Sequence, residues 1–488
     1  MTLTESPRRS AARGDGVLSA RPMRHPDASD EQVMTRRGWW LVVINWLIPG
    51  SAQVLAGSRR LGRFGLAATL VMWLLVVLLV AGLLLWRSAT LSVLINPFVL
   101  VALTVIVVAY GVLWIILSLD ALRLTRLVKT ATPGRYLIAL LSVALMLVTG
   151  GTVAFAAPRM LAASNAIDQI FSAGAPIEPD DGYYNVLLLG GDSSEGRDSL
   201  RFDSVSVVSV NADTGKVTIF GLPRQMLNVP FEEGTPMHDI YPNGFQGQAS
   251  QTCSWNAWLN HVRQRVEVCD ANGQFSETGG EDLYPDAAAN GSAPGIEATK
   301  DAAEGILGID VEHYVLLDMH GFASLVDALG GVEIEVTQRL PEGPGPAYTG
   351  QPAEEWATGW IEPGLQTMDG DTAQWYARSR YTTTDWDRMK RQRELQAAIL
   401  EQFTPQNVLT RFQDIAAAGD DLVQTDMPQA DLPYFFELAV KAKEQPIDSI
   451  EFTPNNDYGT DTTPPDYAQI HQDVAEALHP TQDGDGEE

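Results

Sequence analysis

The sequence lacks the motifs of several large enzyme classes. Its 488 residues include only two cysteines and seven histidines. Cys253 and Cys269 lie outside any CxxC pair or His-rich metal pattern. The sequence also has no GxxxxGK[ST] phosphate-binding loop and no GxSxG nucleophile elbow. These absences argue against a zinc enzyme, an ATPase of the P-loop type and a serine hydrolase.

Positive charge is scarce in the C-terminal two thirds of the chain. Residues 1–160 hold 16 Lys and Arg against 6 Asp and Glu, whereas the remaining residues hold 17 against 55. A nucleic-acid partner is not expected, because phosphate backbones require a broad basic surface. The exception is a short basic cluster, which comprises Arg378, Arg380, Arg388, Lys390, Arg391 and Arg393. A small basic cluster in an acidic domain indicates a compact anionic ligand.

Three apolar runs in the first third are long enough to cross a bilayer, which takes about 20 residues. They span 64–86, 97–117 and 136–157. A fourth run, 39–57, is interrupted by Ile-Pro-Gly-Ser at 48–51, which predicts a re-entrant or interfacial segment. The alternative is a fourth full crossing. The sequence therefore predicts a multi-pass protein of the cell membrane, with the membrane region at 39–157.

Arginine and lysine set the expected orientation, because short cytoplasmic loops are enriched in both. The N-terminal tail is rich in arginine, and the loops at 58–63 and 123–135 are also basic, whereas the loop at 87–96 has only Arg87. Three crossings then place the acidic domain outside the cytoplasm. We further expect a disordered basic cytoplasmic tail at 1–38, a linker at 158–182 and an acidic mobile tail at 456–488.

The region 183–455 mixes predicted strands and helices and is therefore of the α/β class. Such mixing fits a sheet that is covered by helices on both faces. Predicted strands lie at 185–191, 203–211, 216–221, 312–318 and 331–336, and predicted helices at 295–308 and 321–330. The polar interval 229–294 is predicted to be an insertion. Outside the cytoplasm its two cysteines would form a Cys253–Cys269 disulfide, the alternative being two unpaired thiols.

The basic cluster is predicted to continue into a helix that begins near Asp385. The apolar stripe of this helix contains Leu395 and Ile399, and counting back in helical steps adds Arg388 and Arg391 to the same inward face. Lys390, Arg393 and Glu394 are expected to point elsewhere. A buried guanidinium needs an anionic partner. The inward arginines therefore indicate an anion-binding site.

Arg378 and Arg380 alternate with Ser379, so an extended chain would direct both guanidinium groups to one side. Together with a helix N-terminus they could bind a phosphate or pyrophosphate. The alternative is a set of solvated arginines paired with surface carboxylates. Asp192 follows one predicted strand and Asp203 begins the next. Two carboxylates at neighbouring strand ends can bind a hard divalent cation, although acidic turn residues are also common without one.

Six segments, in this order, resemble the LytR-CpsA-Psr family: LLLGGD, RFDS, LPR, GFASLVDALGGVEIEV, GLQTMDGDTAQWYARSRY and DWDRMKRQ. The resemblance covers roughly residues 185 to 403. It implies an extracytoplasmic phosphotransferase that moves a glycopolymer from a polyprenyl-pyrophosphate donor to a peptidoglycan acceptor at the membrane. It also implies an α/β/α sandwich, magnesium, and a lipid tunnel, here formed by the VLLL strand and the helices near Leu325 and Leu395.

The resemblance further implies roles for individual residues. Asp192 and Asp203 would hold magnesium. The pyrophosphate would be bound by Arg201, Arg224, Arg378, Arg380 and Arg388, with Arg391 beside them on the helix. The catalytic group would comprise Asp203, Arg380, Asp385 and Arg388, with Asp203 or Asp385 accepting the proton.

Two positions depart from the family's usual pattern. Gln225 stands where Asp is usual, and Phe202 where Ser is usual. The open alternatives are a non-catalytic sensor of lipid pyrophosphates or envelope assembly factor, and a polyprenyl-pyrophosphate hydrolase.

Overall fold

The computed structural model describes residues 23–172, 174–191, 201–379, 381–402, 423–442, 445–453 and 463–480. The chain divides into two compact units. The first comprises Met1–Leu94 and Phe98–Leu161, and the second comprises Ile95–Pro97 and Ala162–Glu488. The first unit is built from helices, and the second contains all of the strands that the described residues form.

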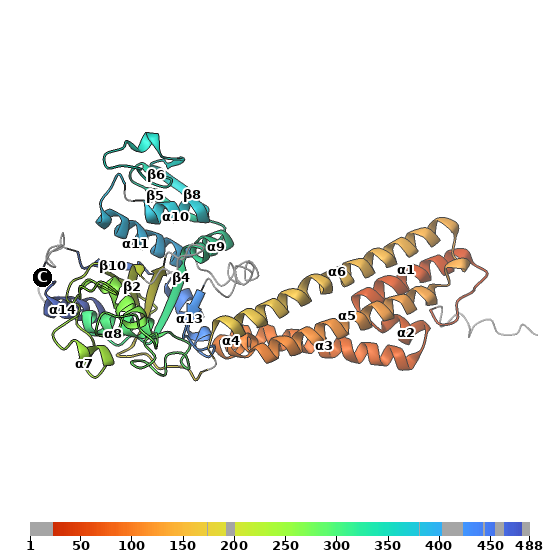
Figure 1. Ribbon diagram of the computed structural model, residues 1–488. Helices are drawn as coiled ribbons and strands as arrows, with labels where there is room; N and C mark the ends of the chain where they lie inside the picture. Colours follow the sequence, from red (N-terminus) through yellow and green to blue (C-terminus); the bar gives the residue numbers. More distant parts are fainter. Residues whose placement is uncertain are drawn as a thin grey trace, which may run out of the picture. The chain divides into compact units, whose positions relative to one another are not determined.

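Long apolar helices make up most of the first unit (Figure 1). Its helices are α1 (Glu31–Leu47), α2 (Ser51–Ala56), α3 (Arg59–Leu85), nearly all of α4 (Arg87–Ile95) and α5 (Pro97–Thr125), and α6 (Thr132–Ile170) as far as Leu161. Within the described part of the chain, three helical stretches are long and apolar enough to cross a membrane, namely Arg59–Leu85, Pro97–Lys129 and Thr132–Asn165. They contain the predicted spans 97–117 and 136–157 and all of 64–86 except Trp86, which suggests a membrane anchor.

The predicted break at 48–51 is present, since α1 ends at Leu47 and α2 begins at Ser51. Gly50 has φ of +94°, and a Cβ there would approach the Leu66 amide at 2.6 Å, so only glycine fits this turn. The turn therefore packs directly on α3. Whether 39–57 spans or re-enters the membrane stays a prediction.

Two predicted irregular segments are partly helical. Helix α1 begins at Glu31, with Asp30 as its N-cap, inside the stretch expected to be disordered up to residue 38. Helix α6 continues through Pro158 to Ile170, well into the expected linker at 158–182. The residues after Pro158 include Met160, Leu161 and several alanines, which are good helix formers and extend the helix despite the missing backbone donor.

A six-stranded mixed sheet forms the centre of the second unit. Its strands are β1 (Tyr183–Gly191), β2 (Phe202–Asn211), β3 (Val217–Leu222), β4 (His313–Asp318), β9 (Val423–Thr425) and β10 (Asp448–Glu451), in the order β10-β3-β2-β1-β4-β9. β1 pairs antiparallel with β2 and parallel with β4. The predicted strands at 185–191, 203–211, 216–221 and 312–318 are thus confirmed, and the α/β class is confirmed with them.

Helices pack on both faces of this sheet. One face, with Leu187, Leu189 and Val207, packs against α8 (Pro294–Leu307) in the main hydrophobic core. On the other face, Val208 and Ile219 pack against residues of α11 (Asp385–Gln402) and α13 (Leu432–Ala442). This arrangement follows from strands that are apolar on both sides.

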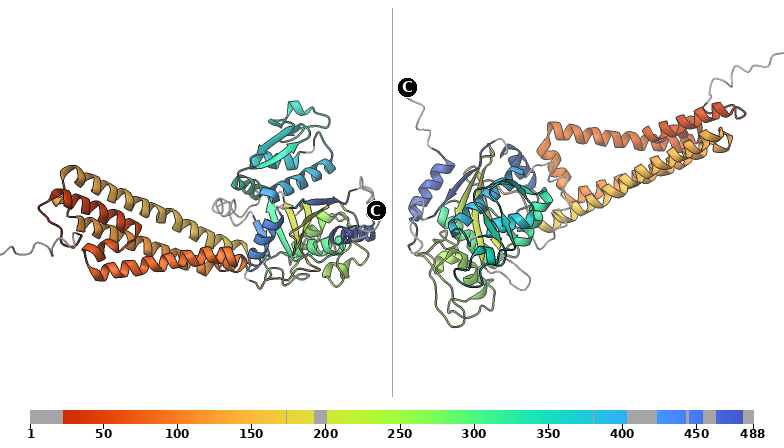
Figure 2. Two further views of the ribbon diagram at one scale, coloured as in Figure 1. Left: turned by 180° about the vertical axis from the view of Figure 1, so that it is seen from behind. Right: turned by 90° about the horizontal axis from the view of Figure 1, so that it is seen from above.

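A smaller group of helices and strands, called the smaller structure below, lies on the side of α11 that faces away from the main sheet (Figure 2). It contains α9 (Met319–Leu329), the antiparallel pair β5 (Val332–Val336) and β8 (Gly364–Met368), the pair β6 (Leu340–Glu342) and β7 (Gly359–Ile361), and α10 (Gly370–Arg378). The predicted strand at 331–336 is therefore real but pairs outside the main sheet. Leu395 of α11 packs with Val332 and Ile334 of β5. Helix α11 thus has two buried faces, one against each sheet.

The predicted mobile tail from 456 contains helix α14 (Tyr467–Leu478), so that prediction is wrong for these residues. Ile470, Val474 and Leu478 recur at steps of four and are buried in the main core. The apolar stripe holds the helix on the domain although the surrounding sequence is acidic.

The predicted insertion 229–294 is folded against the same core rather than standing apart from it. It contains α7 (Pro236–Ile240), a 3₁₀ turn at Leu259–His261 and a π-helical turn at Gln264–Val268. Aromatic residues such as Phe245 and Trp255 fill its interior. The Cys253–Cys269 disulfide is present and closes part of the insertion.

Candidate functional site

The ends of β1, β2 and β3 bring three predicted site segments to one edge of the main sheet. Gly191 at the end of β1 pairs with Phe202 at the start of β2, across a register shift. Val205 pairs with Leu222, which ends β3 two residues before Arg224. Arg201, Asp203 and Arg224 therefore lie close together. Asp192 lies outside the described residues.

Arg224 and Asp203 form an ion pair in which the guanidinium Nη1 donates to Oδ1 of the carboxylate. The side chain of Asp203 is 39% exposed and that of Arg224 is 17% exposed. The pair is thus fixed on the protein side and open on the other. An arginine held in this way remains able to donate to a phosphate, since a guanidinium has five N–H groups.

Arg201 is exposed, and its guanidinium is hydrogen-bonded to a residue of the insertion. Its Nε and Nη2 donate to Oε1 of Gln264, at 3.2 and 3.0 Å. His261 lies nearby and is 3% exposed. Burial, and then the charge of Arg201, lower the pKa of His261 to about 4, so its imidazole is neutral near pH 7. Nothing in the sequence pattern singled out Gln264 or His261, because contacts between an insertion and a strand end have no local signature.

Helix α11 runs across the main sheet toward the same edge. The guanidinium of Arg393 covers Gly221 of β3, and the side chain of Gln396 hydrogen-bonds Ser206 of β2 at 3.2 Å. Ala397 and Leu400 pack further along, with Val217 and Ile219. Helix α11 and strand β3 therefore run in opposite directions, and the N-terminal end of α11 lies toward the C-terminal end of β3.

This direction brings the start of α11 to the Arg224 end of β3. Arg388 precedes Arg393 by five residues, about 7.5 Å along a helix. Arg224 follows Gly221 by three residues, about 10 Å along an extended chain. The Arg388 position on α11 therefore lies toward the same end of the sheet as the Arg224–Asp203 pair, on the helix face of Leu395 rather than on that of Arg393. Arg388 is 5% exposed, which agrees with its predicted inward direction.

The segment between α10 and α11 is held by Arg391. Its Nε donates to the Tyr376 carbonyl at 3.0 Å, its Nη2 to the Ser379 carbonyl and its Nη1 to Oγ1 of Thr383 at 3.3 Å. Arg391 is buried, as predicted, but its partners are protein oxygens rather than a ligand. Its predicted role in binding pyrophosphate stays a prediction, and these contacts give it a structural role.

Of the three other predicted site residues in this segment, only Arg378 has a described side chain. Arg378 is exposed at the end of α10, with its guanidinium 5.7 Å from the centre of the Trp375 ring. Arg380 lies outside the described residues. Asp385 begins α11, but its side chain lies outside the described part of the structure. The predicted catalytic roles of Arg380 and Asp385 therefore stay predictions.

The structure corrects the prediction for Arg393, which was expected to point away from the buried face of α11. Its side chain is 4% exposed and forms an ion pair with Glu451 of β10 at 3.3 Å. The prediction assumed one buried face, whereas α11 has two, and Arg393 lies on the face toward the main sheet. Nη1 and Nη2 of Arg393 are buried and have no hydrogen-bond partner among the described residues.

The described residues supply one carboxylate of the predicted magnesium pair, Asp203. Among them no group of three His, Cys, Asp or Glu side chains could hold a metal ion. A magnesium ion usually needs only one or two protein carboxylates, because water and phosphate oxygens complete its shell. Asp203 fits such a ligand because its carboxylate is partly exposed beside the arginines.

A cavity of about 190 Å³ lies at the opposite end of the sheet and is not the candidate site. Its lining includes Tyr183, Asn185, Gly308 and His471. Tyr183 begins β1, whereas the arginines lie beyond its end at Gly191. At 3.3 Å per residue these two ends are about 26 Å apart.

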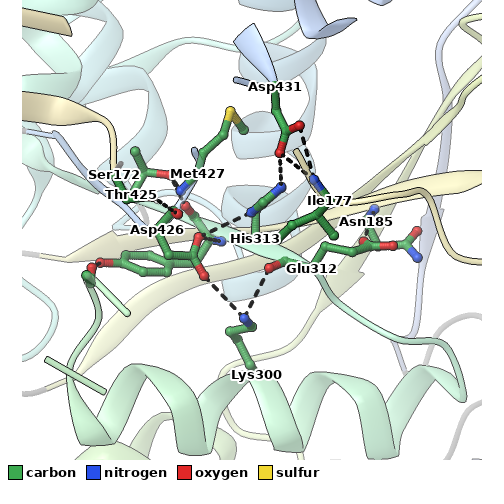
Figure 3. A network of polar contacts seen from close by, with 12 residues as sticks. Ser172, Ile177, Asn185, Lys300, Glu312, His313, Thr425, Asp426, Met427 and Asp431 are labelled. Atoms are coloured by element: carbon green, nitrogen blue, oxygen red, sulfur yellow. Dashed lines mark hydrogen bonds and ion pairs between the residues drawn. The ribbon is translucent and has the colours of Figure 1, made fainter. Parts of the chain in front are cut away.

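The start of β4, also at that opposite end, carries a buried network of charged side chains (Figure 3). His313 lies 3.6 Å from Asp426 and 3.3 Å from Asp431, and Lys300 lies 3.2 Å from Asp426. Asp431 also accepts the amide of Ile177, in the segment that precedes β1. This network fixes the segment to the domain and was not predicted, because its members are far apart in the sequence.

Comparison with known proteins identifies the family. A model described as the LytR_cpsA_psr family matches residues 159–479. Since the match covers more than half of the chain, the protein belongs to the LytR-CpsA-Psr family, as its motifs predicted.

Several curated relatives are similar at the level of sequence. The polyisoprenyl-teichoic acid–peptidoglycan teichoic acid transferase TagU of Halalkalibacterium halodurans is 26% identical over 272 residues, which cover 55% of this chain and 69% of TagU. The cell wall biosynthesis protein LcpA of Corynebacterium glutamicum is 26% identical over 61% of this chain and 56% of LcpA. Biofilm regulatory protein A of Streptococcus mutans is 24% identical over 52% of each chain. The chain thus spans about half the length of several relatives that it matches.

Solved structures are more distantly similar. TagV of Bacillus subtilis has a TM-score of 0.39 and is 18% identical, over 61% of this chain and 98% of TagV. TagT, solved with bound octaprenyl pyrophosphate lipid, has a TM-score of 0.35 and is 18% identical, over 62% of this chain and 92% of TagT.

Proposed function

We propose that the protein transfers a glycopolymer from a polyprenyl-pyrophosphate donor to a peptidoglycan acceptor, outside the cytoplasm at the cell membrane. The observation that carries the proposal is the Arg224–Asp203 ion pair beside Arg201, at the end of the sheet toward which the start of α11 extends. Guanidinium groups from separate parts of the chain would form a basic site in an acidic domain. Such a site suits a diphosphate. TagU is named as a polyisoprenyl-teichoic acid–peptidoglycan teichoic acid transferase and LcpA as a cell wall biosynthesis protein, which supports this choice of substrate.

The chemical step would be phosphoryl transfer. A hydroxyl oxygen of the acceptor glycan attacks the phosphorus that carries the polymer. A new P–O bond forms, the bond from this phosphorus to the bridging oxygen breaks, and the polyprenyl phosphate leaves. Arg224 and Arg388 would stabilise the negative charge that develops on the diphosphate. The proton of the hydroxyl would pass to Asp203 or Asp385.

Magnesium belongs to the same proposal. Asp203, with Asp192, would hold the ion, which would neutralise charge on the diphosphate oxygens. Asp203 would then be shared between the ion and Arg224.

The lipid chain of the donor would lie against the face of the main sheet that carries α11. Leu188 of β1 pairs with Val315 of β4 on inner strands, yet neither is fully buried. Leu317 and Leu325 nearby are also partly buried. Leu395 is 1% exposed and belongs to the core of the smaller structure, so we assign it to packing. We include in the proposal the α/β/α layering that is usual in the family, with the lipid between the sheet and the helices.

The test is an incubation of the full-length protein in detergent with a labelled polyprenyl-pyrophosphate glycan, magnesium and peptidoglycan. The proposal predicts that label moves to peptidoglycan and that polyprenyl phosphate accumulates in equal amount. Release of polyprenyl phosphate without labelled peptidoglycan would identify a hydrolase. Binding of the donor without turnover would identify a sensor or assembly factor, and Gln225 would then be the first residue to replace by Asp.

A further inference from the structure

Two consecutive residues of the disulfide-bonded insertion contact two consecutive residues of the candidate site. The guanidinium of Arg263 lies 5.2 Å from the centre of the Phe202 ring. The next residue, Gln264, accepts two hydrogen bonds from Arg201, at 3.2 and 3.0 Å. Phe202 is 1% exposed, so it fixes the strand end beneath the insertion. The insertion is therefore attached to the segment that carries Arg201 and Asp203.

Gln264 is itself held in place. Its side-chain Nε2 donates to the Ser254 carbonyl at 3.0 Å, and its own carbonyl accepts the amide of Cys269 at 3.0 Å. The Cys253–Cys269 disulfide joins the residue before Ser254 to the residue that caps the π-helical turn. The side-chain amide of Gln264 thus has a fixed orientation, with Oε1 directed at Arg201.

The insertion also contacts the segment that carries Arg224. The Asn260 amide donates to the Arg224 carbonyl at 3.0 Å, and the Leu259 amide donates to the Met226 carbonyl at 3.0 Å. The same loop therefore contacts both arginine-bearing segments. It sets the position of Arg201 relative to Arg224.

We propose that Gln264 is a positioning residue that orients the Arg201 guanidinium toward the diphosphate of the donor. The proposal rests on the proposed function, since it assumes that Arg201 binds that diphosphate. An exposed arginine loses side-chain conformational freedom when it is fixed. Gln264 lowers this cost before the ligand binds. A neutral amide does so without cancelling the charge, whereas a carboxylate at the same position would compete with the phosphate for Arg201.

A double-mutant cycle on the full-length protein tests this role. The measured quantity is the Kd for undecaprenyl pyrophosphate, with magnesium, for wild type, Gln264→Ala, Arg201→Ala and the double variant. We expect Gln264→Ala to weaken binding about fivefold, since fixing the arginine in advance accounts for roughly 1 kcal/mol. We expect no further weakening when Gln264→Ala is added to Arg201→Ala, because the glutamine acts through the arginine. Unchanged affinity in Gln264→Ala, or additive effects, would overturn the inference.

Two further variants separate positioning from folding. Gln274→Ala replaces an exposed glutamine of the same insertion and is expected to bind as wild type does. Gln264→Glu keeps an acceptor oxygen for Arg201 but loses the donor to the Ser254 carbonyl, so its affinity should fall, and its melting temperature is measured beside the affinity to separate the two effects. Affinity of Gln264→Glu equal to wild type would also overturn the inference. If wild type does not bind undecaprenyl pyrophosphate, the proposed function fails and the inference fails with it.

Discussion

Arg393 of α11 lies over Gly221 of β3, so closely that a single added carbon on Gly221 would overlap the guanidinium. The contact joins the helix that carries Arg388 to the strand that leads to Arg224. It therefore fixes the two halves of the candidate site relative to each other. The glycine is required here by the close approach of a side chain, since Gly221 pairs with Ser206 as an ordinary strand residue.

Replacing Gly221 by alanine should therefore destabilise the protein. The methyl group would displace the Arg393 guanidinium, at a cost of about 1–3 kcal/mol. Chemical denaturation of the full-length protein measures this change in the free energy of unfolding. Gly191→Ala is the matched control, because among the described residues a Cβ there would meet only Leu316 Cδ1, at 4.0 Å. Equal stability of the two variants would show that Arg393 does not occupy this position.

Arg391 should matter for stability through the carbonyl groups that it binds. Arg391→Met leaves the carbonyls of Tyr376 and Ser379 without this donor, and we expect a loss of about 1–3 kcal/mol in the free energy of unfolding. Its neighbour Lys390 has a side chain that is 70% exposed, so Lys390→Met should change stability by less than about 0.5 kcal/mol. If Arg391→Met folds as stably as wild type but loses donor binding, Arg391 is a ligand rather than a structural residue.

The network around His313 predicts a pH dependence of stability. Burial alone would lower the pKa of His313, but Asp426 and Asp431 outweigh it and raise the pKa above its usual value. The stabilisation that protonated His313 contributes is fully present below pH 6.5, the usual pKa of histidine. It is lost as the pH rises through the raised pKa of His313. Burial opposes ionisation of Asp426, yet His313 and Lys300 lower its pKa, so its contribution is lost only as the pH falls below 3.8.

The melting temperature measured between pH 5 and pH 9 tests this prediction. His313→Gln should remove part of the decrease on the alkaline side. His479→Gln, in an exposed pair with Asp181, should leave the decrease unchanged. Identical pH profiles for wild type and His313→Gln would contradict the prediction.

Removal of divalent cations should abolish transfer if magnesium takes part. We expect chelation to reduce the rate at least about 100-fold, the scale for loss of one strong electrostatic contact to a transition state. Addition of magnesium should restore the rate in wild type but not in Asp203→Ala. Full activity in the presence of a chelator would exclude the role proposed for Asp203 as a metal ligand.

The sequence was informative where a local pattern decides the structure. Short apolar runs, alternating in the case of β2, predicted β1 to β4, and the helical spacing around Leu395 correctly placed Arg388 on a buried face. Arg393 was misjudged because its burial depends on a second sheet that contacts α11. Helix α14 was not predicted because it lies in acidic sequence, where the steps of four between Ile470, Val474 and Leu478 are its local signal. Gln264 and His313 could not have been found, since their partners come from distant segments.

The most direct test of the account is the affinity of the full-length protein for undecaprenyl pyrophosphate in wild type, Arg224→Ala and Arg388→Ala. Arg339→Ala is the matched control, because Arg339 forms an exposed ion pair with Glu362. We expect each site variant to bind at least about tenfold more weakly, which corresponds to roughly 1.4 kcal/mol, and the control to bind as wild type does. Equal affinity in all four proteins would contradict the claim that arginines from separate segments form one diphosphate site.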